Sequence, residues 1–291
     1  MLSIDIIIRI ILSLIMLGVG MSINFSDFKA IIQRPKALGI GLVAQMIVLP
    51  FFAILLVWWS PLSVEFKLGI IILSLCPGGN MSNYVSYLTN ANTALSISLT
   101  TSNGLLTVFS IPLVANWASA FLLSEQQSFT LPFWSTALDI FSLVLLPAAI
   151  GVMIRYYKVA WAKQLENPIK WTTYILMALL FVVFAFGKEE QGGLQFTIAE
   201  IWQILPYTLA LNVFGLIFGF YFGQYNHLST RNSITLSIET GLQNTALTLL
   251  IATSLIGNID MAKPAFVYAA FTFWTTLGFV YFIKKRLSSR T

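Results

Sequence analysis

The ten residues Ser74–Asn83 read SLCPGGNMSN and lie inside an otherwise apolar segment. Proline lacks a backbone donor and glycine tolerates non-helical geometry, so Pro77, Gly78 and Gly79 together favour a break in a helix. In a membrane, such a break is tolerated only where the freed backbone groups face protein, water or an ion. The stretch therefore indicates either a proline kink used for packing or a binding site inside a membrane-spanning segment.

The composition is typical of a membrane protein. Of 291 residues, 57% are hydrophobic and 9% are charged, whereas an average soluble domain carries about 25% charged residues. Mean hydropathy is +0.83. Apolar runs of roughly 20 residues predict an all-α polytopic protein with nine transmembrane helices in a single domain over residues 1–291. The predicted segments cover about 3–22, 37–59, 66–88, 92–116, 132–155, 169–187, 201–223, 229–255 and 263–284.

The basic residues predict the orientation of these segments, because cytoplasmic loops are enriched in Lys and Arg. Alternate loops hold 12 of the 16 basic residues, namely Lys29, Arg34, Lys36, Arg155, Lys158, Lys163, Lys170, Arg231, Lys284, Lys285, Arg286 and Arg290. We therefore expect an integral protein of a bacterial cytoplasmic membrane, with its N-terminus outside and its C-terminus in the cytoplasm. The net charge of +5 does not indicate a nucleic-acid partner, because these residues lie in short loops between apolar runs.

A weak internal repeat places a second polar stretch at the position that matches the first. The repeat units cover about 3–116 and 169–285 and are joined by the helix 132–155, so they have opposite orientations, as in many secondary transporters. The third helix of the second unit contains IETGLQNTAL, Ile238–Leu247, with Gly241 as its candidate break. Two polar breaks at matching positions favour a binding site over a packing kink.

Three stretches resemble the bile acid:sodium symporter family, and the resemblance extends over essentially the whole chain. They are GLVAQMIVLP (41–50), CPGGNMSNYVSYLTNANTALSISLT (76–100) and IETGLQNTALTLLIA (238–252). The resemblance implies a core domain and a panel domain, with two broken helices that cross near the bilayer midplane. It also implies sodium-coupled import of an organic anion by alternating access. The substrates it suggests are bile-acid-like compounds or, in preference, smaller pantoate-like or keto acids.

The same resemblance implies two sodium sites and a substrate site. The first sodium site would comprise Ser82, Asn83, Ser96, Thr100 and Glu239. The second would comprise Gln45, Glu239 and Gln243 with the carbonyls of Thr240 and Leu242. The substrate site would comprise Asn80, Met81 and Asn244. Serine and threonine in helices commonly bond back to their own backbone, which is the structural alternative for each hydroxyl. Glu239 is different, because an ionised carboxylate at mid-membrane is costly unless compensated. No nearby Lys or Arg offers that compensation in the sequence, so a bound cation explains this glutamate.

Two other functions are alternatives to sodium symport. Arsenite export would use a cysteine in the first break and a glutamate in the second, which Cys76 and Glu239 match superficially. An intramembrane enzyme would need a constellation that the sequence lacks, since Cys76 is the single cysteine and His227 the single histidine. We therefore expect no enzyme, no disulfide, no organic cofactor and no obligate protein partner. The expected partners are sodium, an organic anion and the lipid bilayer.

Overall fold

The computed structural model of the chain describes residues 4–22, 35–122, 132–187, 193 and 195–288. Within these ranges the chain is helical and has no β-strand, as the all-α prediction requires. Five helices are long and apolar enough to cross a membrane: Pro35–Trp58, Thr93–Leu122, Phe133–Tyr157, Ile198–Tyr225 and Asp260–Ser288. They coincide with five of the predicted segments, and the total of nine crossings stays a prediction.

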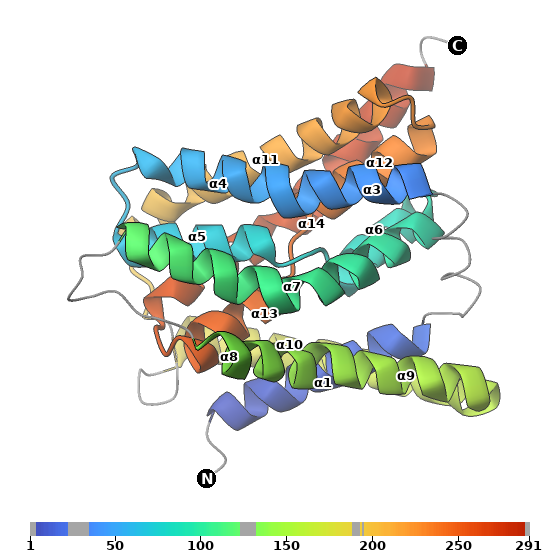
Figure 1. Cartoon of the computed structure of the whole chain (residues 1–291), viewed down its shortest axis with the longest axis horizontal. Coiled ribbons are helices and arrows are strands. Elements are labelled where there is room, and N and C mark those ends of the chain that lie inside the picture. The colour runs from blue at the N-terminus through green and yellow to red at the C-terminus, as the bar shows by residue number, and fades with distance from the viewer. Residues whose placement is uncertain (1–3, 23–34, 123–131, 188–192, 194, 289–291) are drawn as a thin grey trace.

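One layer of helices lies at the bottom of Figure 1. It consists of α1 (Ile4–Ser22), α8 (Phe133–Ile140), the π-helical turn η2 (Phe141–Leu145), α9 (Leu146–Tyr157) and α10 (Val159–Phe186). Helix α1 packs along α9 and α10. Gly20 and Gly151 permit this close approach, because a Cβ at either position would collide with the backbone of the neighbouring helix. Arg9 of α1 pairs with Asp139 of α8 at 3.4 Å.

The remaining helices pack together above this layer in Figure 1. They are α3 (Pro35–Val43), the π-helical turn η1 (Ala44–Val48), α4 (Leu49–Trp58), α5 (Val64–Leu75), α6 (Asn80–Leu88), α7 (Thr93–Leu122), α11 (Ile198–Tyr225), α12 (Thr230–Gly241), α13 (Thr245–Leu250), the π-helical turn η4 (Ile251–Leu255), the 3₁₀ turn η5 (Asp260–Ala262) and α14 (Lys263–Ser288). Most of their buried apolar side chains belong to one cluster, which also includes residues of α1.

The boundaries of α10 differ from the prediction, which began the helix at about residue 169 after a loop. The helix begins at Val159, is separated from the end of α9 by Lys158 alone, and contains Pro168. Its first turns, VAWAKQLEN, are made of residues that mostly favour helix, but they are too polar to count as a membrane span. Hydropathy locates the apolar part of a helix, so polar turns that extend the same helix are read as loop.

Three glycines of α11 set the depth of α12. Gly215, Gly219 and Gly223 are spaced four apart and therefore lie on one face of α11. A Cβ at Gly215 or Gly219 would collide with Thr240, and one at Gly223 would lie 2.7 Å from the Ser233 hydroxyl. The glycine face thus lets α12 lie directly against α11. Because Glu239 belongs to α12, this contact also fixes where its carboxylate lies.

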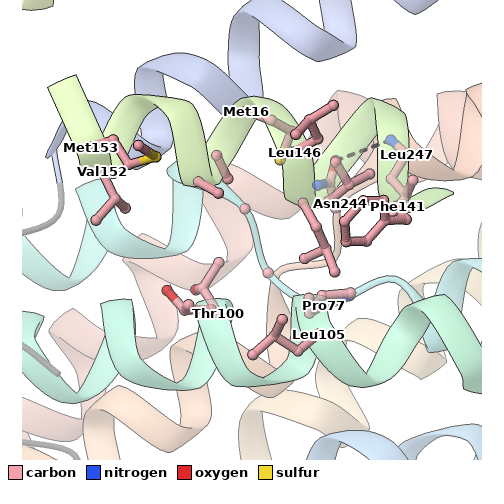
Figure 2. Close-up of a pocket in the computed structure, with 18 residues that line it drawn as sticks. Met16, Pro77, Thr100, Leu105, Phe141, Leu146, Val152, Met153, Asn244 and Leu247 are labelled. Atoms are coloured by element: carbon pink, nitrogen blue, oxygen red, sulfur yellow. Dashed lines mark hydrogen bonds between the residues drawn. The ribbon is translucent and has the colours of Figure 1, made fainter.

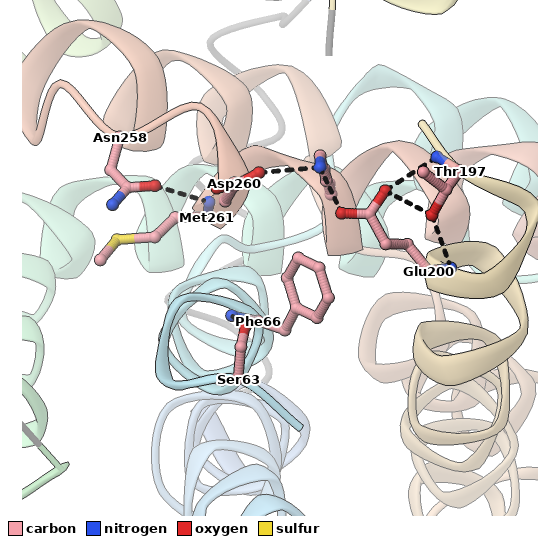
Figure 3. A network of polar contacts seen from close by, with 8 residues as sticks. Ser63, Phe66, Thr197, Glu200, Asn258, Asp260 and Met261 are labelled. Carbon is pink, nitrogen blue, oxygen red and sulfur yellow. Dashed lines mark hydrogen bonds and ion pairs between the residues drawn. The ribbon is translucent and has the colours of Figure 1, made fainter. Parts of the chain in front are cut away.

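A buried lysine joins the ends at which α5, α11 and α14 begin. Figure 3 shows Phe66, Glu200 and Asp260 at these ends. Lys263 Nζ lies 2.6 Å from Glu200 Oε1 and 2.8 Å from Asp260 Oδ1. It also lies 5.9 Å from the ring centroids of both Phe66 and Phe196. Glu200 is held in turn by a capping box with Thr197 at the start of α11. This cluster stabilises the helix ends and lies apart from the polar breaks.

Candidate functional site

The two polar stretches interrupt their helices and touch each other. Helix α5 ends at Leu75 and α6 begins at Asn80, while α12 ends at Gly241 and α13 begins at Thr245. The backbone N–H of Asn244 donates to the carbonyl of Cys76 at 3.3 Å. The two breaks are therefore in direct contact, although they are far apart in the sequence.

Glycine residues make room where the two breaks meet. A Cβ at Gly78 would lie 2.6 Å from the Ser82 hydroxyl and 3.0 Å from the Leu242 carbonyl oxygen. A Cβ at Gly79 would lie 3.3 Å from Asn244 Nδ2. Pro77 contributes by removing one backbone donor from the same segment. The sequence Pro-Gly-Gly thus both ends the helix and makes room for the opposing chain.

The second break is held by side chains that the sequence analysis did not single out. The carbonyl of Gly241 accepts hydrogen bonds from Asn212 Nδ2 and from the Tyr268 hydroxyl, each at 2.6 Å. Asn212 in turn accepts from the Thr275 hydroxyl at 2.8 Å. Asn212 and Tyr268 are fully buried. In the sequence, an Asn inside the apolar run of α11 is the signal for such a network, because a buried carboxamide needs hydrogen-bond partners.

The residues predicted for the first sodium site converge on Glu239. The Ser96 hydroxyl donates to Glu239 Oε1, and the Thr100 hydroxyl donates to Oε2 at 3.1 Å. Asn83 Oδ1 lies 2.8 Å from the Ser96 hydroxyl oxygen and 3.4 Å from the Thr100 hydroxyl oxygen. Ser82, in the first turn of α6, is fully buried beside the same carboxylate, and its hydroxyl donates to the Gly79 carbonyl at 2.9 Å. The carboxylate itself is 2% exposed.

The residues predicted for the second sodium site form a neighbouring group. Gln45, in the π-helical turn η1, donates through Nε2 to Gln243 Oε1 at 2.7 Å, and Gln243 donates to the Thr240 carbonyl at 2.8 Å. Gln45 is 1% exposed, yet its Oε1 has no hydrogen-bond partner among the described residues. The hydrogen bonds of the described residues do not join Glu239 to this group. Leu242 is buried, and the backbone at this point is extended.

A cavity of about 430 Å³ lies beside these groups, between α7 and the helix 133–157 (Figure 2). Thr100, Thr101, Gly104, Gly78, Gly79 and Asn244 line one side, and Met16 with apolar residues between Phe141 and Met153 line the other. Asn244 Oδ1 accepts from the Leu247 N–H at 3.1 Å, which caps α13. The cavity is therefore lined mostly by apolar side chains, and its polar side chains are those of Thr100, Thr101 and Asn244.

The three predicted substrate residues differ in their positions. Asn244 lines the cavity, as Figure 2 shows. Met81 is 44% exposed and is not among the lining residues. The side chain of Asn80 lies outside the part of the chain that the structure describes, although its backbone begins α6. Thr101 and Gly104 also line the cavity but were not predicted as site residues. Their closeness to the predicted Thr100 on the same helix is the sequence signal for them.

Comparison with known proteins identifies the family. The family model described as Sodium Bile acid symporter family matches residues 9–192, more than half of the chain. The chain belongs to the sodium bile acid symporter family. The resemblance seen in the sequence is thereby confirmed, and together with the apolar spans it makes the chain an integral membrane protein.

Relatives in this family come from plants, bacteria and mammals. A rice protein named a probable sodium/metabolite cotransporter, BASS2, is 28% identical over 88% of this chain and 58% of its own length. The sodium-dependent transporter YocS of Bacillus subtilis is 26% identical over 93% of this chain and 80% of its own length. A human sodium-dependent organic anion transporter is 29% identical over 81% of this chain and 60% of its own length. The chain thus spans about three fifths of the plant and human relatives.

Proposed function

We propose that this member of the sodium bile acid symporter family imports an organic anion together with sodium by alternating access. The observation that carries the proposal is the position of Thr100. Its hydroxyl donates to the buried Glu239 carboxylate at 3.1 Å, and the same residue lines the cavity. One side chain therefore contacts both the cavity available to a solute and the group formed by Ser82, Asn83, Ser96, Thr100 and Glu239, which we call the acidic cluster. Such a contact lets binding of a cation alter the shape of the solute site.

The donor set of the acidic cluster fits sodium. Carboxylate, hydroxyl and carboxamide oxygens are ligands suited to a hard cation, and Ser82, Asn83, Ser96, Thr100 and Glu239 supply them within one cluster. We assign the second sodium ion to Gln45, Gln243, Glu239 and the carbonyls of Thr240 and Leu242. Gln45 Oε1 is buried and has no hydrogen-bond partner within the described part of the chain, which supports this assignment because a buried acceptor is costly when unsatisfied.

The shape of the cavity supports an organic anion with an apolar body. Its polar side chains are those of Thr100, Thr101 and Asn244, and the glycines of the first break also line it. Asn244 Nδ2 and the N–H groups at the start of α6 are donors there, and a helix N-terminus favours an anion. The apolar remainder favours a larger hydrophobic carboxylate over the pantoate-like or keto acids that the sequence suggested. The human relative, named an organic anion transporter, is consistent with this class of substrate.

The membrane arrangement in this proposal follows the sequence analysis. The broken helices α5–α6 and α12–α13, with α1 and α10, add four crossings to the five continuous spans, giving nine. The N-terminus lies outside, the C-terminus lies in the cytoplasm, and residues 3–116 and 169–285 form the inverted repeat joined by helix 132–155. The layer of α1, α8–α9 and α10 would be the panel domain, and the other helices the core. The cavity between them supports relative movement of these two parts.

Arsenite export receives less support from the same geometry. Cys76 is fully buried and is not among the residues that line the cavity. Its backbone carbonyl accepts from Asn244, so the residue serves the contact between the two breaks.

Uptake into proteoliposomes tests the proposal. With an inward sodium gradient, purified protein should accumulate at least one acid from a panel that contains cholate, pantoate and a branched keto acid. Glu239→Gln keeps the size of the side chain but removes its charge, and we expect it to abolish sodium-driven uptake. Glu65→Gln, in the first turn of α5 and partly exposed, is the matched control and should transport normally. Wild-type sodium dependence in Glu239→Gln would refute the proposed role of the carboxylate.

A further inference from the structure

Two buried side chains hold one carbonyl group at the point where α12 ends. The Gly241 carbonyl accepts from Asn212 Nδ2 of α11 and from the Tyr268 hydroxyl of α14, each at 2.6 Å. Both side chains are fully buried. A carbonyl oxygen has two lone pairs, so these two donors satisfy it. The Gly241 carbonyl is therefore not available to an ion, and its direction is set by two helices other than its own.

The orientation of the Asn212 carboxamide is itself fixed by α14. Asn212 Oδ1 lies 2.8 Å from the Thr275 hydroxyl, so the carboxamide turns its Nδ2 toward the Gly241 carbonyl. Tyr268 and Thr275 are seven residues apart, which is about two helical turns, so they lie on one face of α14. This face of α14 and Asn212 of α11 together hold the end of α12.

The hydrogen bonds at Gly241 fix the backbone on both sides of it. The C=O of Gly241 and the N–H of Leu242 belong to one peptide unit, which is planar. The Leu242 N–H donates to the Ile238 carbonyl at 2.9 Å. This peptide unit is thus held both by its oxygen and by its nitrogen, and it lies between the carbonyls of Thr240 and Leu242. Its orientation therefore limits the directions in which those two carbonyls can point.

Helix α11 also contacts the residue before this peptide unit. A Cβ at Gly215 would collide with the Thr240 carbonyl oxygen, and the Thr240 hydroxyl lies 2.6 Å from the Gly215 carbonyl. Gly215 follows Asn212 by three residues, so both lie on the same face of α11. One face of α11 thus holds two consecutive residues, Thr240 and Gly241, where the helix breaks.

We propose that Asn212 and Tyr268 are positioning residues for the second sodium ion. They hold the Gly241 peptide unit and thereby set the directions of the Thr240 and Leu242 carbonyls, while they do not bind the ion themselves. The inference rests on the proposed function, in which these two carbonyls are ligands of the second sodium ion. It adds that the affinity for this ion depends on how α11 and α14 lie against the break in α12–α13.

Thermal unfolding of the purified full-length chain tests this inference. Melting temperature is measured against NaCl concentration, with choline chloride keeping ionic strength constant. Tyr268→Phe removes only the hydroxyl, and Asn212→Leu removes both polar atoms at similar volume. We expect each variant to raise the half-saturating sodium concentration about tenfold. Thr208→Val is the matched control, because Thr208 is buried one turn before Asn212 and its hydroxyl lies 3.2 and 3.1 Å from the Ile204 and Leu205 carbonyls of its own helix.

The outcomes separate a positioning role from a merely structural one, and both from the proposed function. A structural role would lower the melting temperature at every sodium concentration but leave the half-saturating concentration unchanged. Half-saturating concentrations in Tyr268→Phe and Asn212→Leu within about twofold of Thr208→Val would therefore overturn the inference. If Asn212→Leu does not fold, Tyr268→Phe decides by the same criterion. A wild-type protein that melts at the same temperature in sodium and in choline would contradict the proposed function, and the inference would fall with it.

Discussion

At the scale of single residues, the proposed sodium binding depends on Glu239. Its carboxylate is buried and is surrounded by hydroxyls that donate to it, from Ser96 and Thr100. None of the ion pairs among the described residues involves Glu239. A buried carboxylate inside a membrane needs a compensating charge, because its desolvation is costly. A cation bound at this carboxylate supplies that charge without a lysine or arginine.

Thr100 should couple the two halves of the site. Thr100→Val preserves the shape of the side chain but removes the hydroxyl that donates to Glu239, so we expect a half-saturating sodium concentration about tenfold higher. Because Thr100 also lines the cavity, the apparent KM for the transported acid should rise at fixed sodium.

Initial uptake rates at varied sodium and varied substrate measure both effects. Ser98→Ala is the control, since the Ser98 hydroxyl is buried but donates to the Ala94 carbonyl of its own helix at 2.6 Å. Equal sodium dependence in Thr100→Val and Ser98→Ala would contradict the coupling.

At the scale of elements, α7 separates three environments around its circumference. Leu99 faces α3, Ser96 and Thr100 face Glu239, and Gly104 faces the cavity. Gly104 is buried, yet a Cβ at this position would meet no atom within 4 Å. The absence of a side chain at Gly104 therefore leaves room in the cavity. This glycine sets the width of the cavity at a point one helical turn from Thr100.

Gly104→Leu should fill part of the cavity without disturbing the two proposed sodium sites. We expect uptake of the bulkiest transported acid to fall by about fivefold to 150-fold, since overpacking costs on the order of 1–3 kcal/mol. Stabilisation of the purified protein by sodium should persist, because the Glu239 side of α7 is unchanged.

Gly278→Leu is the matched control. Gly278 lies in α14, where a Cβ likewise meets no atom within 4 Å, but it does not line the cavity. If Gly104→Leu and Gly278→Leu transport large acids equally well, Gly104 does not limit the size of the substrate.

At the scale of the whole molecule, charge balance decides the class of substrate. In the proposed function, two sodium ions and one ionised Glu239 would leave a single positive charge near the middle of the membrane, where uncompensated charge is expensive. A bound monocarboxylate would bring the local charge to zero. Net uptake would then move one positive charge inward per cycle, so we expect an inside-negative potential to assist transport.

Paired acid and amide forms of one transported compound test this balance. In proteoliposomes with a clamped potential, the acid should be carried and the neutral amide should not. An inside-negative potential should speed uptake of the acid, because the fully loaded carrier moves positive charge inward. Transport of the amide at the same rate as the acid would show that the proposed charge balance is wrong. An uptake rate of the acid that does not change with membrane potential would show the same.

The sequence by itself determined the features that depend on local chemistry. Pro77, Gly78 and Gly79 end a helix because of their own backbone properties, and the apolar runs place the five continuous spans. The oxygen-bearing residues that gather at Glu239 were also named from the sequence, although through resemblance to a family. Resemblance transfers positions that are shared among relatives, and it carried no signal for Asn212, Tyr268 or Gly104.

Only the tertiary structure decided which of these groups meet. Ser96 and Glu239 are 143 residues apart, and their contact depends on α7 and α12 presenting particular faces. The hydrogen bonds on the Gly241 carbonyl depend in the same way on packing. Local preferences fix whether a segment is helical, but distant contacts follow from how side chains of several helices fill space together. The cavity belongs to this second group, because its walls come from α1, α7 and the helix 133–157, which no local pattern places side by side.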